Sequence, residues 1–598
     1  MLVTHDNLDD CLDYLASKKE IVLDTETFGV KWEDRLFSLQ LWTEDRGFYF
    51  NFLDYGDGTF FFDYSLMDRL QATLFSDSSK TWVMHNSLFD IRRMDIEGVR
   101  FNGSIWDTMI VARLLYNKEF SYSLDNCLKR IGFAKMDKVA EYVKEHHLYT
   151  KVEVEGKKLK EKLLHYDKVP FALMYEYGLS DVEMTWKLYC YQQTKMTDDQ
   201  FNVAQNDSLL IKTIYRMMKR GIQLNIEYCN NAYEAEMKAH NEIQKHLADL
   251  TGSEYKSGPK WLGQALQDQG VDIGKTEKGN LSLGKKELKA MDNAIASSVL
   301  DLRDHEKLAT AFYSPLPRFA DSSGVIHPSF RLAGTDTRRL SCAEPNIQQM
   351  PKGSSTTGYS VRNAFKPREE HCFVMMDYDQ MEYRIMADYA GEMGMIEAIK
   401  GGLDPHTYVA NMMGVDRKLA KTLNFGLLYG MGIQKLSAAL GVEVEHAKQL
   451  KAKYYSELRM VQKLHRDIQD TAKSRGYVKN KYGARYYLDK PEFAYKLVNY
   501  LIQGTGAEVV RHAMNKIDYV LEGMKSGMLA QIHDEILFEI HKDEVHIVPE
   551  LRRILQDEYQ PINGMNLTVG CEYSLESWCE ETKKDWSEYE VETSNRLL

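Results

Sequence analysis

Short apolar runs that end in acidic residues recur along the chain. Phe373–Met376 reads as a buried strand and is followed at once by Asp377. Gly527–Ile532 is another apolar run, and it breaks at His533-Asp534-Glu535 before apolar residues resume, which predicts a hairpin with two carboxylates at its turn. A lone strand–Asp–helix junction would be an ordinary helix cap. If the two strands pair, however, Asp377 and Asp534 meet, and carboxylates in this arrangement suit Mg²⁺.

A helical pattern between these acidic runs places cations and aromatic rings on one face. The residues recur at steps of four between Asp416 and Gly430 and form a stripe roughly 18 Å long: Arg417, Lys421, Phe425 and Tyr429. Cations suit phosphates, and an aromatic ring suits a sugar or a base. The pattern therefore predicts a nucleotide-binding helix.

The first part of the chain carries a separate set of acids. Glu20–Leu23 reads as a strand leading to Asp24 and Glu26, which share a face because strand residues i and i+2 point the same way. Asp90 follows, and Asp181 lies in a helical stretch one turn after Tyr177. A single D-x-E pair carries little weight, whereas four acids in this order with the tyrosine form a much stronger pattern.

These motifs resemble those of family A DNA polymerases, in that family's order and spacing across about half the chain. Three of them resemble the polymerase motifs: Asp377–Arg384, Arg417–Gly430 and His533–Glu535. Thr337–Ser341, Pro345–Gln348 and Gln503–Thr505 look like further signatures of the family. The N-terminal acids resemble the DEDDy proofreading exonucleases, which form the first domain of many family A polymerases.

The resemblance implies an α/β and α+β multidomain protein, with an RNase H-like exonuclease domain and a right-hand polymerase domain of palm, fingers and thumb. Apolar patterns at Val325–Leu332 and Val361–Phe365 predict palm strands beside Arg339. The expected boundaries are 1–193 for the exonuclease, 194–315 for the thumb, 316–390 and 491–578 for the palm, 391–490 for the fingers and 579–598 for a disordered or surface-packed extension.

The resemblance also assigns residues. Two Mg²⁺ ions per site, or Mn²⁺ in their place, would be held by Asp377, Asp534 and the backbone at Tyr378, and by Asp24, Glu26, Asp90 and Asp181. Glu535 would lie beside the polymerase site, and Tyr177 would orient the attacking water of the nuclease. The nucleotide would contact Arg417, Lys421, Phe425, Tyr429 and Glu382, with Glu382 excluding ribose. DNA would contact Arg339, Asn346, Gln348, Asn499, Gln503 and His533.

Composition sets wider limits. A chain of 598 residues predicts two to four domains, and 44% hydrophobic with 27% charged residues is typical of a soluble protein. The net charge of −12 argues only weakly against nucleic-acid binding, because a local basic groove can coexist with an acidic total. Eight scattered cysteines, no signal pattern and no membrane-length apolar run favour the cytoplasm.

Two features bear on the biological setting and the partners. No 5′-nuclease domain is expected before Met1, which suggests a phage-type replicative enzyme. The stretch 253–279 is too short for a thumb insertion that recruits a thioredoxin-type partner. We therefore expect a monomer that binds primer–template DNA and dNTPs, has no membrane association, and works beside replisome proteins such as a helicase–primase and a single-strand-binding protein.

Three other functions are weighed against a DNA polymerase with 3′→5′ proofreading. A single-subunit RNA polymerase shares palm motifs, but the complete set of nuclease acids and Glu382 argue against it. A nuclease with an inactive, DNA-gripping second half is disfavoured because the polymerase acids are all present. A non-enzymatic scaffold does not explain two full carboxylate sets.

Overall fold

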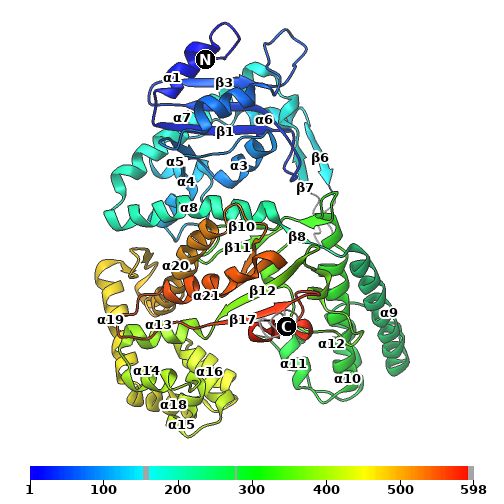
Figure 1. Cartoon of the computed structure of the whole chain (residues 1–598). Helices are drawn as coiled ribbons and strands as arrows, with labels where there is room; N and C mark the ends of the chain where they lie inside the picture. The colour runs from blue at the N-terminus through cyan, green and yellow to red at the C-terminus, as the bar shows by residue number, and fades with distance from the viewer. Residues whose placement is uncertain (153–160, 277–278, 590–598) are drawn as a thin grey trace, which may run out of the picture.

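The computed structural model of the chain describes residues 1–152, 161–276 and 279–589. The N-terminal domain lies at one end, above a central sheet that is flanked by two helical lobes (Figure 1). One lobe holds residues of the predicted fingers and the other holds the predicted thumb. This arrangement confirms the expected multidomain α/β and α+β fold.

The N-terminal domain is built on a five-stranded sheet in the order β3-β2-β1-β4-β5. The strands are β1 (Glu20–Thr27), β2 (Leu36–Trp42), β3 (Gly47–Asn51), β4 (Thr81–Met84) and β5 (Ser104–Asp107). β1 runs antiparallel to β2 and parallel to β4. The helices that carry or adjoin the predicted acids are α3 (Ser87–Ile96), α4 (Thr108–Leu115) and α7 (Phe171–Lys195). The predicted strand before Asp24 and the helical stretch around Tyr177 and Asp181 are both present.

Helix α8 (Asp198–Arg220) joins the N-terminal domain to the rest of the chain. Its start is fixed by a capping box between Thr197 and Gln200. Ser208 accepts the backbone N–H of Ile105 on β5, and Thr213 bonds Asn515 and Asp518 from helix α20 (Lys496–Val520). The helix therefore packs between the exonuclease sheet and α20, although its residues fall within the range expected for the thumb.

The palm is a second five-stranded sheet, in the order β15-β16-β12-β17-β18. Its strands are β12 (His371–Tyr378), β15 (Gly527–Ile532), β16 (Glu535–His541), β17 (Val569–Ser574) and β18 (Lys584–Asp585). β12 pairs antiparallel with β16, which places Asp377 opposite Glu535. The predicted hairpin forms and joins β12 through its second strand, β16, and not through Gly527–Ile532 itself. Helices α13 (Met381–Ala390) and α21 (Val548–Asp557) complete this region.

The prediction of palm strands beside Arg339 was wrong in two places. Val361–Ala364 is a 3₁₀ helix, in which Arg362 stacks on the Trp578 ring at 4.0 Å instead of alternating along a sheet. Val325–Leu332 splits into β9 (Val325–Ile326) and β10 (Ser329–Arg331), because Pro328 between them has no N–H to donate. β9 pairs with β8 (Ile222–Gln223) and β10 with β11 (Ser341–Ala343), so neither joins the palm sheet.

Helices make up both lobes beside the palm. One lobe contains α14 (Met393–Lys400), α15 (Pro405–Met413), α16 (Arg417–Leu428), α17 (Ile433–Leu440), α18 (Val444–Glu457) and α19 (Arg459–Arg475), and leads to the hairpin of β13 (Tyr477–Lys479) and β14 (Arg485–Tyr487). The other contains α9 (Ile226–Thr251), α10 (Pro259–Asp268), α11 (Lys285–Ala290) and α12 (Ala294–Lys307). Two residues of the expected thumb tip, 277–278, lie outside the described residues.

The segment expected to be an extension adds to the palm. β18 pairs with β17 at the sheet edge, and Trp586 is only 7% exposed, stacked on Tyr589 at 4.8 Å. Residues 579–589 are therefore surface-packed; residues 590–598 lie outside the described residues. Within the described part of the chain, no helix combines the length and the apolar content needed to cross a membrane.

Candidate active sites

Three acids meet in the N-terminal domain. Asp24 and Glu26 lie on β1 and Asp181 on α7, and one carboxylate oxygen of each lies within 4.8 Å of the others. Burial, followed by the nearby Asp181, raises the pKa of Asp24 to about 7. Burial and both of the other acids raise the pKa of Glu26 in the same way. Like charges held this close are an arrangement that a bound divalent cation stabilises, so the donor set fits Mg²⁺ or Mn²⁺.

The fourth acid, Asp90, takes a different position. The backbone N–H and the hydroxyl of Thr25 donate to its Oδ1 at 3.1 and 2.7 Å. Asp90 is 2% exposed, and burial and then Asp24 raise its pKa. The middle residue of the Asp24-Thr25-Glu26 motif thus orients Asp90, a contact that the sequence pattern did not indicate.

Tyr177 and Lys135 complete this site. Tyr177 lies one turn before Asp181 on α7, and its ring stacks on Tyr166 at 6.4 Å. The Lys135 ammonium lies 2.6 Å from Asp181 Oδ2 and 4.7 Å from the centre of the Tyr177 ring. Sequence reasoning missed Lys135, because a single lysine in a loop has no spacing relation to the acids.

The second acidic site forms where β12 ends beside the β15–β16 turn. The backbone N–H of Tyr378 donates to the carbonyl of Asp534 at 3.2 Å, so the two tips are in direct contact. His533 has a φ of 57°, which suits a tight two-residue hairpin turn. Burial, then Glu535 and Asp534, raise the pKa of Asp377 to about 6. Acidic groups this close to Asp377 oppose its ionisation, and such an arrangement again fits divalent cations.

Glu535 lies beside Asp377 and is held by neighbours outside the turn, and the Tyr378 side chain is directed into the core. Glu535 is 6% exposed; Trp578 Nε1 donates to it at 3.3 Å, and Lys583 Nζ lies 3.7 Å away. The Tyr378 hydroxyl donates to the carbonyl of Leu555 at 2.8 Å, so this side chain is part of the core and only its backbone faces the acids. Lys583 belongs to the segment expected to be an extension, and no local pattern linked it to Glu535.

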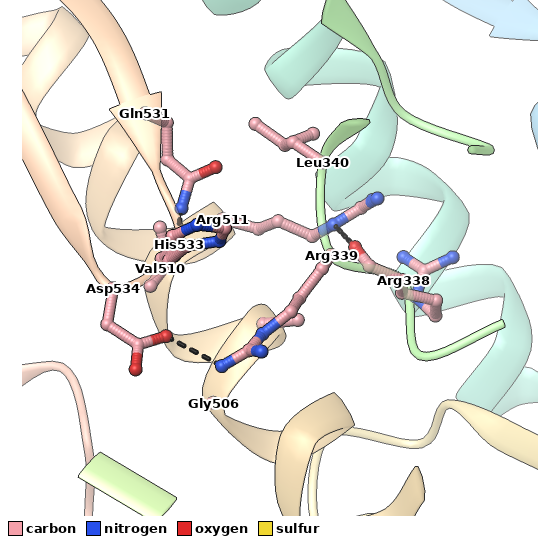
Figure 2. A pocket seen from close by; sticks show the side chains of 10 residues that line it. Arg338, Arg339, Leu340, Gly506, Val510, Arg511, Gln531, His533 and Asp534 are labelled. Carbon is pink, nitrogen blue, oxygen red and sulfur yellow. Dashed lines mark hydrogen bonds and ion pairs between the residues drawn. The ribbon is translucent and has the colours of Figure 1, made fainter. Parts of the chain in front are cut away.

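Arg339 connects the acids with the residue expected to exclude ribose. Its guanidinium donates to Asp534 at 2.8 Å and to Glu382 at 2.9 Å, and Tyr429 donates to the other oxygen of Glu382 at 2.8 Å. Figure 2 shows Arg339 extended towards Asp534 from the loop that also carries Arg338. The structure therefore brings together residues that lie far apart in the sequence.

A buried ionic cluster holds that loop in place. Arg338 has a φ of 63°, a conformation uncommon for a residue with a side chain. Its guanidinium donates to Asp207 at 2.8 Å and also to Glu508, and Arg511 donates to Asp207 at 2.5 Å. Arg511 also donates to the Arg338 carbonyl at 2.9 Å (Figure 2). Four buried charges thus fix the backbone next to Arg339.

The cation and aromatic stripe lies on α16, as the pattern predicted. Asp416 caps the helix by accepting the Leu419 N–H at 2.9 Å. Arg417 and Lys421 are exposed, and Arg417 pairs with Asp404 at 2.9 Å. The rings of Phe425 and Tyr429 stack at 5.9 Å with an interplanar angle of 9°. The cations lie at the start of the helix and the rings at its end, where Tyr429 donates to Glu382.

The remaining candidates lie around these groups. Gln348 Nε2 donates to the Gln531 carbonyl at 3.0 Å, and Gln531 donates to the His533 carbonyl, which ties these residues to the acidic turn. The amide oxygens of Asn346 and Asn499 are buried and have no hydrogen-bond partner among the residues that the structure describes. Gln503 belongs to α20, and its side chain lies beside the hydroxyl of Tyr429. A Cβ on the neighbouring Gly504 would lie 1.8 Å from the Tyr486 hydroxyl, so glycine is required there.

Comparisons with known proteins agree with this geometry. The chain matches the model of DNA polymerase family A over residues 226–580 and a 3′–5′ exonuclease model over residues 1–197. It is 26% identical to DNA polymerase DpoZ of Acinetobacter phage SH-Ab 15497, covering 95% of this chain and 98% of that protein. It is 28% identical to DNA polymerase I of Treponema pallidum (81% of this chain, 50% of the relative) and 33% identical to the thermostable DNA polymerase I of Thermus aquaticus (59% and 45%).

The chain thus spans about half the length of these bacterial relatives. Its fold is similar to a solved structure described as the POL domain of Pol1 from M. smegmatis in complex with DNA primer-template and dNTP. The TM-score is 0.80 at 21% identity, over 96% of this chain and 99% of that one. Since the polymerase family model alone spans more than half of the 598 residues, the chain belongs to DNA polymerase family A.

Proposed function

We propose that this protein is a template-directed DNA polymerase that adds dNTPs to a primer 3′-hydroxyl and proofreads with a 3′→5′ exonuclease. The observation that carries the proposal is the contact of Arg339 with both Asp534 and Glu382, opposite a helix of cations and aromatic rings. A second carboxylate centre in a separate domain supports the nuclease activity. Family membership and the two matching domain models support both assignments.

In the polymerase site, Asp377, Asp534 and the Tyr378 backbone would hold two Mg²⁺ or Mn²⁺ ions. When bound, these ions supply a lowered pKa for the primer hydroxyl and positive charge for the leaving pyrophosphate. Glu535 keeps its position beside Asp377 through Trp578 and Lys583 and acts through its charge.

The nucleotide and DNA are held by this chain's own side chains. Arg417 and Lys421 neutralise the triphosphate, Phe425 and Tyr429 pack on the sugar and base, and Glu382 fills the space of a 2′-hydroxyl. Arg339 contacts the primer-terminal base pair after leaving Asp534. Minor-groove acceptors are nearly independent of sequence, so amide and imidazole donors there permit copying of any template; the donors we assign are Asn346, Gln348, Asn499, Gln503 and His533.

In the nuclease site, Asp24, Glu26, Asp90 and Asp181 would hold the divalent ions, and the Tyr177 hydroxyl orients the attacking water. We assign residues 1–193 to this domain, 194–315 to the thumb, 316–390 and 491–578 to the palm, 391–490 to the fingers and 579–598 to an extension. We also propose that the protein acts as a monomer in the cytoplasm, with a helicase–primase and a single-strand-binding protein as replisome partners.

One assay tests the proposal. A labelled primer–template is incubated with the protein and Mg²⁺, with no nucleotide, with dNTPs or with rNTPs. We expect shortening without nucleotides and extension with dNTPs. Extension with rNTPs alone would indicate an RNA polymerase, and shortening without any extension would indicate a nuclease with an inactive second half.

Variants then assign the activities to their sites. Asp24→Ala with Glu26→Ala is expected to abolish shortening and leave extension, and Asp534→Ala is expected to do the reverse. If the nuclease double variant remained folded yet lost extension, the assignment of two separate sites would be wrong.

A further inference from the structure

The Lys135 ammonium lies inside the nuclease carboxylate cluster. Its Nζ is 2.6 Å from Asp181 Oδ2, and the side chain is 24% exposed. The same Nζ lies over the Tyr177 ring, 4.7 Å from its centre. One cation therefore touches both the acid and the tyrosine that α7 contributes to the site.

The Lys135 ammonium offers three N–H donors in a place otherwise dominated by carboxylates. Asp181, which it contacts, is joined within 4.8 Å by oxygens of Asp24 and Glu26.

The neighbouring lysines of this region lack such a position. Lys138 pairs with Glu176 at 3.0 Å, with both side chains at least half exposed. Lys129 pairs with Asp125 one turn away on a surface helix. Such exposed ion pairs contribute little to stability and lie away from the acids, whereas Lys135 contacts residues that we assign to the reaction.

Lys135 contacts Oδ2 of Asp181, whereas Oδ1 is buried without a partner among the described residues, so a divalent ion bound at Oδ1 would lie close to the ammonium. When ions and DNA bind, repulsion between the ion and the ammonium favours movement of the flexible lysine stem towards another anion, and the substrate brings one in the phosphate to be cleaved. Resting on the proposed nuclease function, we propose that Lys135 is a further catalytic residue, which pairs with Asp181 in the free protein and donates to a non-bridging oxygen of the scissile phosphate during hydrolysis.

The step balances without proton transfer from Lys135. The water oxygen forms a bond to phosphorus, the bond from phosphorus to O3′ breaks, and O3′ leaves with a proton that derives from the water. Lys135 retains its own proton and stabilises the charge that develops on the phosphoryl oxygens. The ring contact with Lys135 also holds Tyr177 against the cluster.

This role predicts opposite changes in rate and in metal affinity. Lys135→Met keeps the apolar stem but removes the charge. We expect single-turnover excision of a single-stranded oligonucleotide at saturating Mn²⁺ to slow by about 10–100-fold. We expect the nuclease site of the DNA-free protein to bind Mn²⁺ several-fold more tightly, because the competing ammonium is gone.

The experiment uses the full chain, with Asp534→Ala added to all variants so that polymerase-site binding is reduced equally. Mn²⁺ binding is followed by electron paramagnetic resonance, and excision by quenched flow. Lys135→Arg should recover most of the excision rate, and Lys138→Met serves as the matched surface control, expected to behave as the parent. Thermal unfolding midpoints establish that each variant is folded.

Three results would overturn the inference. One is excision by Lys135→Met within twofold of the parent. Another is slow excision combined with weaker Mn²⁺ binding, the pattern of a purely structural lysine. The third is failure of Lys135→Arg to recover excision while it remains folded and binds Mn²⁺. Absence of excision by the parent itself would instead refute the proposed nuclease function.

Discussion

Arg339 offers one guanidinium to two carboxylates, and Tyr429 supports one of them from the other side. Glu382 is 8% exposed and has a donor on each of its oxygens. A carboxylate fixed at both oxygens keeps one position, which is what rejection of a 2′-hydroxyl by shape requires. The selectivity that we propose for Glu382 therefore depends on Arg339 and Tyr429 as well.

A graded variant series tests this dependence. Glu382→Ala should raise incorporation of rNTPs relative to dNTPs by about tenfold or more, since the blocking group is removed. Tyr429→Phe removes only one donor and should give a smaller increase. The ratio of kcat/KM for matched rNTP and dNTP is the measurement, in an Asp24→Ala background. An unchanged ratio in Glu382→Ala would exclude it as the ribose filter.

The nuclease acids predict a pH-dependent stability. Burial and then Asp181 raise the pKa of Asp24 to about 7, and the pKa values of Glu26 and Asp90 are raised as well. A carboxyl whose folded pKa exceeds its unfolded value, near 4, binds more protons in the folded state. The contribution of such a carboxyl to the free energy of unfolding is therefore largest below pH 4 and is lost as the pH rises through about 7.

We accordingly expect the unfolding temperature of the ion-free protein to fall between pH 5 and pH 8 by roughly 5 °C more than that of a variant without the two carboxylates. Mg²⁺ should restore more of the midpoint at pH 8 than at pH 5. The control is Asp24→Asn with Glu26→Gln, for which both differences should shrink. Equal pH slopes for parent and control, measured by calorimetry in EDTA, would contradict the assignment.

At the scale of elements, patterns within a short stretch of sequence predicted the bounds of single strands and helices. The apolar run Gly527–Ile532 is β15 to the residue, and the four-residue steps from Arg417 predicted α16. Contacts between distant segments left no such signal. Lys135 reaches Asp181 across 46 positions, and Lys583 reaches Glu535 from beyond the expected end of the palm. Arg338 adopts its positive φ because Asp207 and Glu508 hold it, which its neighbours in the sequence cannot reveal.

The short edge strand β18 yields a stability prediction. Trp586 packs on Tyr573 and Tyr589 beside that strand. Trp586→Ala should lower the free energy of unfolding by about 3 kcal/mol, the usual cost of removing a buried aromatic side chain. Denaturant titration measures this change, and Ser587→Ala at the neighbouring position serves as control. A change below about 1 kcal/mol would mean that the segment contributes little to the palm.

At the scale of the molecule, the nuclease and the palm share an apolar core. Val22 and Val83 of the exonuclease sheet belong to the same buried cluster as Val203 of α8 and Leu501 of α20. Polar contacts lie beside it: Arg113 and Lys118 both pair with Asp336 at 2.8 Å, and Tyr500 donates to it at 3.3 Å. Asp336 lies two residues before Arg338, so the exonuclease domain also supports the loop that carries Arg339.

Asp336→Asn tests that support. The change leaves two cations with a weakened partner at the junction, and the Arg339 loop should become less well held. We expect KM for primer–template to rise several-fold in an Asp24→Ala background, with kcat reduced less. Steady-state extension of one nucleotide measures both constants. Asp45→Asn, at an exposed turn of the exonuclease domain away from the junction, is the control, and an unchanged KM in Asp336→Asn would show that the junction is only structural.

The shared core has a consequence for the timing of editing. A buried apolar core joins the exonuclease domain to the palm through α8, so we expect the nuclease domain to keep its position when a mismatched primer end forms. The primer strand then has to move from the polymerase site to the nuclease site. The rate of excision is then limited by the rate at which the primer end separates from its template. Matched primers that end in A·T pairs should accordingly be trimmed faster than those ending in G·C pairs, while single strands of either composition should be trimmed alike. The stability of the terminal base pairs would then set the rate at which each primer end is excised.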